Sequence, residues 1–180
     1  MKWIKYYSLM ILLYIFQTVL GSSIRVMGIL PDPVFVLAVY VALKEDRPGS
    51  LVFGLVAGLI KDFSLMQTFG LNGFITLYTV LMISLLSEKY FYPSMLVNGL
   101  FVFVSDFLYQ SLYFFLRFAM WGRGDFIYSA LNLIIPQCVY NLIVSIVIYI
   151  ICSFMTGDKI FDSIIVWREF KWNRKITKKY

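Results

Sequence analysis

Six long apolar segments, separated by short polar breaks, run along the chain from one end to the other. They lie at 6–24, 26–43, 50–66, 71–87, 94–119 and 127–155. A helix needs about 20 mainly apolar residues to cross the hydrocarbon core of a bilayer, with a range of roughly 17–25. The segments therefore predict an all-α integral membrane protein, a bundle of six transmembrane helices. Because 61% of the 180 residues are hydrophobic, we expect 1–155 to form one transmembrane domain without a soluble one beside it.

The second and third segments leave two topologies open. Pro31-Asp32-Pro33 interrupts the second, and an aspartate can cap a helix whose first residue is proline, so the regular helix is predicted to begin at Pro33. The third is apolar only from Leu51 to Ile60, which leaves a re-entrant hairpin possible. The loop 44–50 carries four charges and belongs in water, however, so we favour full crossings. Both topologies put the two termini on the same side.

The positions of lysine and arginine predict the orientation. If the N-terminus is inside, twelve of the sixteen basic residues are cytoplasmic, and the outer side receives only Arg25, Lys61, Arg117 and Arg123. Basic residues are enriched in cytoplasmic loops, so we predict that both termini are cytoplasmic. The sequence after Gly21 lacks an Ala-x-Ala-like cleavage site, and we expect the first span to be retained.

A ladder of small residues ends in an acid in the third segment, at Ser50, Gly54, Gly58 and Asp62. Residues four apart share one helical face, and small residues on such a face let two membrane helices approach closely. The ladder is therefore interpreted as a helix-packing face within the bundle or as an interface for a partner, and we favour internal packing. Asp62 is expected near the outer end of its helix, where water can reach it.

Further polar residues interrupt the last two segments. In the fifth, Asp106, Gln110 and Arg117 share a face with Tyr113; the sixth contains Asn132, Gln137 and Asn141. Pro136 should bend this last helix. Polar residues inside a membrane most often form hydrogen bonds between helices, and this is the interpretation we favour over a binding site for a ligand or partner.

Several kinds of chemistry are disfavoured by what the chain contains. It has no histidine, so Ser-His and Cys-His catalysis and histidine metal sites are excluded. Asp62 and Asp106 could suggest a membrane aspartyl protease, but neither lies in a Gly-x-Gly-Asp motif. We therefore predict a protein that is not an enzyme and needs no cofactor. A vitamin-binding S component of an energy-coupling-factor transporter is the alternative, although the bulky first helix lacks the small-residue face typical of that class.

The basic tail, 156–180, could include an interfacial helix over 160–167. Its cluster consists of Lys171, Arg174, Lys175, Lys178 and Lys179. Attraction to anionic lipid is the interpretation we favour, and a contact with a cytoplasmic protein is the alternative. The confinement of the charge to a tail beside the membrane gives no indication of nucleic-acid binding.

The order of these motifs resembles the MreD family of rod shape-determining proteins. The resemblance covers about residues 30–145: Pro31-Asp32-Pro33 opens the second span, Gly54-x3-Gly58-x3-Asp62 follows, and Gly70 marks the next turn. Asp106 and the set Asn132, Pro136 and Asn141 match the later spans of that family. Lys61 and the long basic tail are less typical.

The resemblance implies a non-enzymatic scaffold or regulator in the bacterial inner membrane that takes part in cell-wall elongation and rod-shape determination. It implies a fold similar to the S components. It also implies binding to MreC, a single-span protein, through the transmembrane bundle, alongside MreB, RodA and a class B penicillin-binding transpeptidase.

Overall fold

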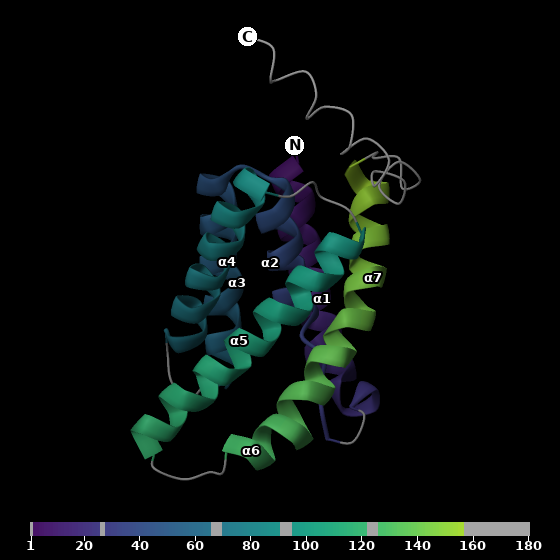
Figure 1. Ribbon diagram of the computed structural model, residues 1–180. Coiled ribbons are helices and arrows are strands. Elements are labelled where there is room, and N and C mark those ends of the chain that lie inside the picture. The colour runs from purple at the N-terminus through teal and green to yellow at the C-terminus, as the bar shows by residue number, and fades with distance from the viewer. Residues whose placement is uncertain (1, 26–27, 66–69, 91–94, 122–125, 157–180) are drawn as a thin grey trace.

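The computed structural model describes residues 2–25, 28–65, 70–90, 95–121 and 126–156, and its regular elements are all helical (Figure 1). The elements are α1 (Lys2–Ile24), α2 (Pro33–Lys44), α3 (Arg47–Leu65), α4 (Leu71–Tyr90), α5 (Met95–Trp121), α6 (Phe126–Ser129), the π-helix η1 (Ala130–Ile134) and α7 (Ile135–Thr156). Two of the described stretches are long and apolar enough to cross a membrane, Met95–Leu116 and Ile127–Thr156. The prediction of a helical membrane protein is confirmed at this level.

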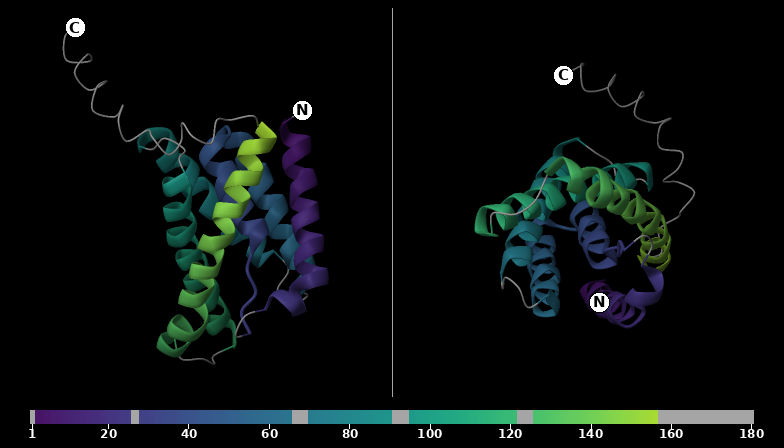
Figure 2. Two further views of the ribbon diagram at one scale, coloured as in Figure 1. Left: turned by 90° about the vertical axis from the view of Figure 1, so that its right-hand side faces the viewer. Right: turned by 90° about the horizontal axis from the view of Figure 1, so that it is seen from below.

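The short helix α2 forms the centre of the bundle and packs against α1, α3, α4, α5 and α7 (Figure 2). All residues from Pro33 to Leu43 are buried. The predicted start is confirmed, because Asp32 Oδ1 accepts a hydrogen bond from Phe35 N at 3.1 Å. Its 12 residues rise only about 18 Å at 1.5 Å per residue. The helical part of the second segment therefore covers little more than half of a hydrocarbon core of about 30 Å.

Helices α3 and α4 are in close contact along the ladder of small residues. Ser50 Oγ lies 3.2 Å from Ser84 Oγ. A Cβ added at Gly54 would lie 2.7 Å from Val80 Cγ2, and one added at Gly58 would lie 2.6 Å from the carbonyl oxygen of Asn72. The structure therefore places this face against α4, and the glycines permit a close approach of the two helices that a larger residue would prevent.

The beginning of α1, the α2–α3 loop and the end of α7 meet at one end of the bundle (Figure 1). Lys5 Nζ donates to the carbonyl oxygen of Met155 at 2.8 Å, and Tyr6 donates to Glu45 Oε1 at 2.9 Å. Lys44 Nζ donates to Thr156 Oγ1 at 3.1 Å. The described ends of the chain thus lie on the same side of the bundle.

The last apolar segment changes helix type just before its proline. The π-helix η1 ends at Ile134, two residues before Pro136. Pro136 has no N–H to donate to the carbonyl group of Asn132, four residues earlier, and its ring crowds that carbonyl group. A π-helical turn is one way in which a helix accommodates such a break.

Candidate functional site

A largely buried ion pair joins the start of α2 to the end of α3. Lys61 Nζ bonds to Asp32 Oδ2 and also donates to the Tyr109 hydroxyl group at 3.0 Å. The ammonium group lies 4.5 Å from the centre of the Tyr109 ring and 5.7 Å from that of Phe35. A lysine at the centre of a bilayer costs about 2.5–3.5 kcal/mol on insertion scales, and these partners offset that cost. Lys61 therefore connects α2, α3 and α5.

Asp62 binds the first turn of α4. Its Oδ2 atom accepts hydrogen bonds from Gly70 N at 3.0 Å and Gly73 N at 2.9 Å. Its Oδ1 atom accepts from the backbone and side-chain nitrogens of Asn72, at 3.0 and 2.9 Å. The first N–H groups of a helix lack partners within it and attract negative charge. Asp62 is only 2% exposed, so the expectation that water solvates its carboxylate is wrong. The N–H groups at the start of α4 bind the carboxylate instead.

Asn141 on α7 links the start of α2 to Asp106 on α5. Its Oδ1 atom accepts from the backbone nitrogen of Asp32 at 2.7 Å, and its Nδ2 atom donates to Asp106 Oδ2 at 2.8 Å. Tyr109 continues the chain of bonds by donating to Asn72 Oδ1. One connected set of hydrogen bonds, which we call the polar network, thus spans α2, α3, α4, α5 and α7. Its members are Asp32, Lys61, Asp62, Asn72, Asp106, Tyr109 and Asn141.

The remaining predicted polar positions differ in their surroundings. Gln110 is half-buried and donates a long hydrogen bond of 3.5 Å to Asp106 Oδ1. Gln137 is half-buried, whereas Asn132 is exposed and donates to the backbone carbonyl group of Tyr128. Asn132 therefore does not join the polar network. The side chain of Arg117 lies outside the described residues, as does the basic cluster Lys171, Arg174, Lys175, Lys178 and Lys179.

Sequence reasoning missed three members of the network. The charge count places Lys61 on the outer side, and the sequence motifs do not single out Asn72 or Tyr109. Two signals were present in the sequence: Tyr109 lies three residues after Asp106, on the same helical face, and Asn72 follows the glycine turn at Gly70. Gly70 has φ of +94°, a conformation that favours glycine.

The polar network is suited to holding helices together. The hydrogen bonds of Asp62 go to α4, and those of Asp106 go to Asn141 and Gln110. The two acids are therefore bound by different groups, unlike a pair that shares one proton. Among the described residues, no cluster of three histidine, cysteine or acidic side chains could hold a metal ion.

Comparison with known proteins gave one match. A family model described as rod shape-determining protein MreD matches residues 1–156. Searches of curated proteins and of solved structures found no significant match.

Proposed function

The chain belongs to the MreD family of rod shape-determining membrane proteins, and on this premise we propose that it is a non-enzymatic scaffold of the elongation machinery. In this proposal the transmembrane bundle binds the single span of MreC. The complex then acts beside MreB, RodA and a class B penicillin-binding transpeptidase. The family role in rod-shape determination is the established part, and the binding partners and the scaffold mechanism are the proposal.

The observation that carries the scaffold proposal is that every carboxylate in the polar network has a hydrogen-bond partner. Asp32, Asp62 and Asp106 are all bound by groups from other helices or by the start of their own helix. Breaking such buried bonds is costly, so the network favours one fixed arrangement of the helices. A fixed bundle with an apolar exterior suits a protein that positions other membrane proteins.

We also propose six membrane crossings with both termini in the cytoplasm. Helices α1, α3 and α4 contain 23, 19 and 20 residues, within the roughly 17–25 residues of a span, and α5, with 27 residues, is long enough to cross with some tilt. The second crossing combines the segment before Asp32 with the buried helix α2. The start of α1 and the end of α7 meet at one end of the bundle, which supports two termini on the same side of the membrane.

The transporter S-component alternative is not favoured, because the chain belongs to the MreD family. An S-component-like arrangement of the six spans remains part of the proposal. The basic tail is proposed to bind anionic lipid, with a cytoplasmic protein as the alternative partner.

Co-purification with MreC tests the scaffold proposal. The full chain, carrying an affinity tag, is expressed together with MreC in a rod-shaped bacterium that lacks its own MreD. We expect restored rod shape and recovery of MreC in a stoichiometric complex. Recovery of the folded chain without MreC, in cells that stay round, would contradict the proposal.

Labelling of single cysteines tests the topology. Cys138 and Cys152 are first replaced by alanine, and one exposed position is then changed to cysteine, either Asp46→Cys or Arg25→Cys. A reagent that cannot cross the membrane should label Arg25→Cys in intact cells and label Asp46→Cys only after the cells are opened. The opposite pattern would refute the orientation, and equal labelling of both in intact cells would refute the second crossing.

A further inference from the structure

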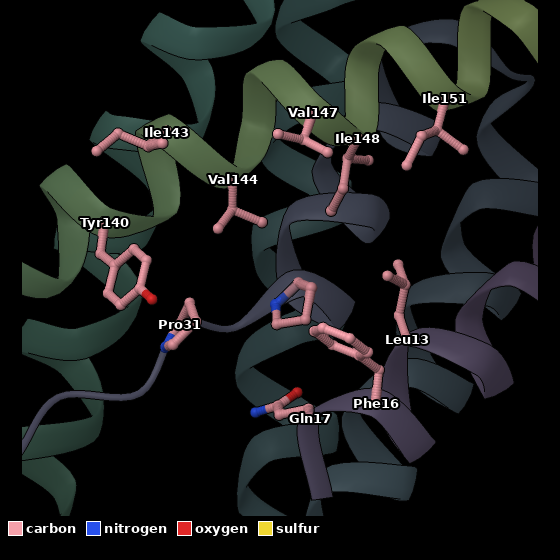
Figure 3. A pocket seen from close by; sticks show the side chains of 11 residues that line it. Leu13, Phe16, Gln17, Pro31, Tyr140, Ile143, Val144, Val147, Ile148 and Ile151 are labelled. Carbon is pink, nitrogen blue, oxygen red and sulfur yellow. The ribbon is translucent and has the colours of Figure 1, made fainter. Parts of the chain in front are cut away.

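An apolar groove lies between α1 and α7 (Figure 3). Its volume is about 200 Å³, and its floor includes Pro31 and Pro33, the residues on either side of Asp32. Pockets for small molecules usually measure about 300–1,000 Å³. The groove is therefore small for a vitamin-sized ligand but large enough for one or two apolar side chains.

The two walls of the groove present helix faces that nothing in the described chain covers. On α7, Ile143, Val147 and Ile151 are spaced four residues apart, and they are 56%, 52% and 38% exposed. On α1, Phe16 is 47% exposed. Side chains four apart form the ridges between which a neighbouring helix packs. The walls thus have the form of a seat for one more helix.

Gln17 supplies an amide group to this mainly apolar lining. Its side chain extends from α1 beside Phe16 (Figure 3). Its Oε1 atom is buried and accepts no hydrogen bond from any residue that the structure describes. A buried acceptor without a donor is unfavourable, and lipid tails offer no donor. A helix that carries a hydroxyl or amide side chain does offer one.

We propose that a transmembrane helix of a single-span partner docks between α1 and α7. It places apolar side chains over Pro31 and Pro33, and the Gln17 amide turns toward it to accept one hydrogen bond. This inference rests on the proposed function, in which the partner helix is the span of MreC. The small-residue ladder on α3 is already packed against α4, so the groove provides a different surface for the partner. The docked helix would cover the point where α2 begins.

A photo-crosslinking residue at Val147 tests this position. The control is the same residue at Val52, which is 57% exposed on α3, a helix that does not line the groove. Both full-length variants are expressed with MreC in native membranes, irradiated and analysed by mass spectrometry. We expect the adduct at Val147 to map to the MreC span and the variant at Val52 to give none.

Gln17→Leu provides a second test that does not depend on a bulky substitution. It removes an acceptor that has no donor, so the thermal stability of the isolated chain should not fall. The loss of one hydrogen bond between membrane helices should lower recovery of MreC about threefold. Unchanged recovery would overturn the role of Gln17.

The outcomes separate the inference from the proposed function. One set of outcomes recovers MreC while the crosslinker at Val147 reacts only with phospholipid, only with a second copy of the chain, or with nothing. In each of these cases the groove is not the docking site, and the proposed function stands. If the unmodified chain recovers no MreC, the partner in the proposed function is wrong and the inference falls with it.

Discussion

Replacing Asp62 with alanine removes the acceptor of four hydrogen bonds at the start of α4. A buried donor left without a partner costs about 1–3 kcal/mol. The four donors share one carboxylate, and Gly70 N is only partly buried, so water and fraying of the first turn recover part of the loss. We expect a decrease of about 3–5 kcal/mol in the free energy of unfolding. Asp62→Asn, which keeps one carbonyl oxygen, should cost about 2–3 kcal/mol.

The two buried cysteines allow a direct assay. Cys138 and Cys152 are both buried and free, so a thiol-reactive dye should report their exposure as the purified protein is heated in detergent. In soluble proteins of this size, 1 kcal/mol shifts Tm by about 2–4 °C, which predicts a decrease of about 6–20 °C for Asp62→Ala. Titration with a denaturing detergent gives the free energies.

Asp46→Ala is the matched control. Asp46 is exposed, and its Oδ2 atom accepts one hydrogen bond, from Gly49 N at 3.2 Å, at the start of α3. An exposed helix cap of this kind contributes about 1 kcal/mol. If Asp62→Ala destabilised the protein no more than Asp46→Ala does, the reasoning that the buried carboxylate fixes α4 against α3 would be refuted.

The ladder and the ion pair lead to two further predictions with the same assay. Gly58→Ala places a Cβ 2.6 Å from backbone atoms of α4 and should lower the free energy of unfolding by about 1–3 kcal/mol. Gly99→Ala, whose Cβ meets nothing within 4 Å, is the control and should raise the free energy of unfolding by up to about 1 kcal/mol. Shifts of the same sign in the two variants would contradict the close approach of α3 and α4. Lys61→Met leaves the Asp32 carboxylate buried without a cation and should lower the free energy of unfolding by about 3–5 kcal/mol. Adding Asp32→Asn to this variant should restore part of that loss. Purely additive effects of the two substitutions would show that the two side chains are not coupled.

The features predicted well from sequence are those set by neighbouring residues. The start of α2 follows from Asp32 and Pro33 alone, because an aspartate cap and a proline at the first position act within one turn. The turn at Gly70 follows from the freedom of glycine at positive φ. Neither depends on where the other helices lie.

The features missed depend on contacts between distant parts of the chain. The partners of Asp62 are mainly backbone N–H groups, which have no signature in the sequence. Asn132 and Asn141 are the same residue type in the same segment, yet only Asn141 is buried. Asn132 lies within the π-helical turn, which changes the helical phase before Asn141 is reached, and periodicity assumes a constant phase.

The buried start of α2 also has a consequence for biogenesis. The backbone nitrogen of Asp32 bonds to Asn141, which is 109 residues later in the chain. At about 5–20 residues per second, the ribosome delivers Asn141 roughly 5–20 s after Asp32. During that interval the break before α2 lacks its partner from the last helix. We therefore expect the first two segments to wait beside the insertion machinery until translation is almost complete, so that α2 is among the last parts of the bundle to be sealed from lipid.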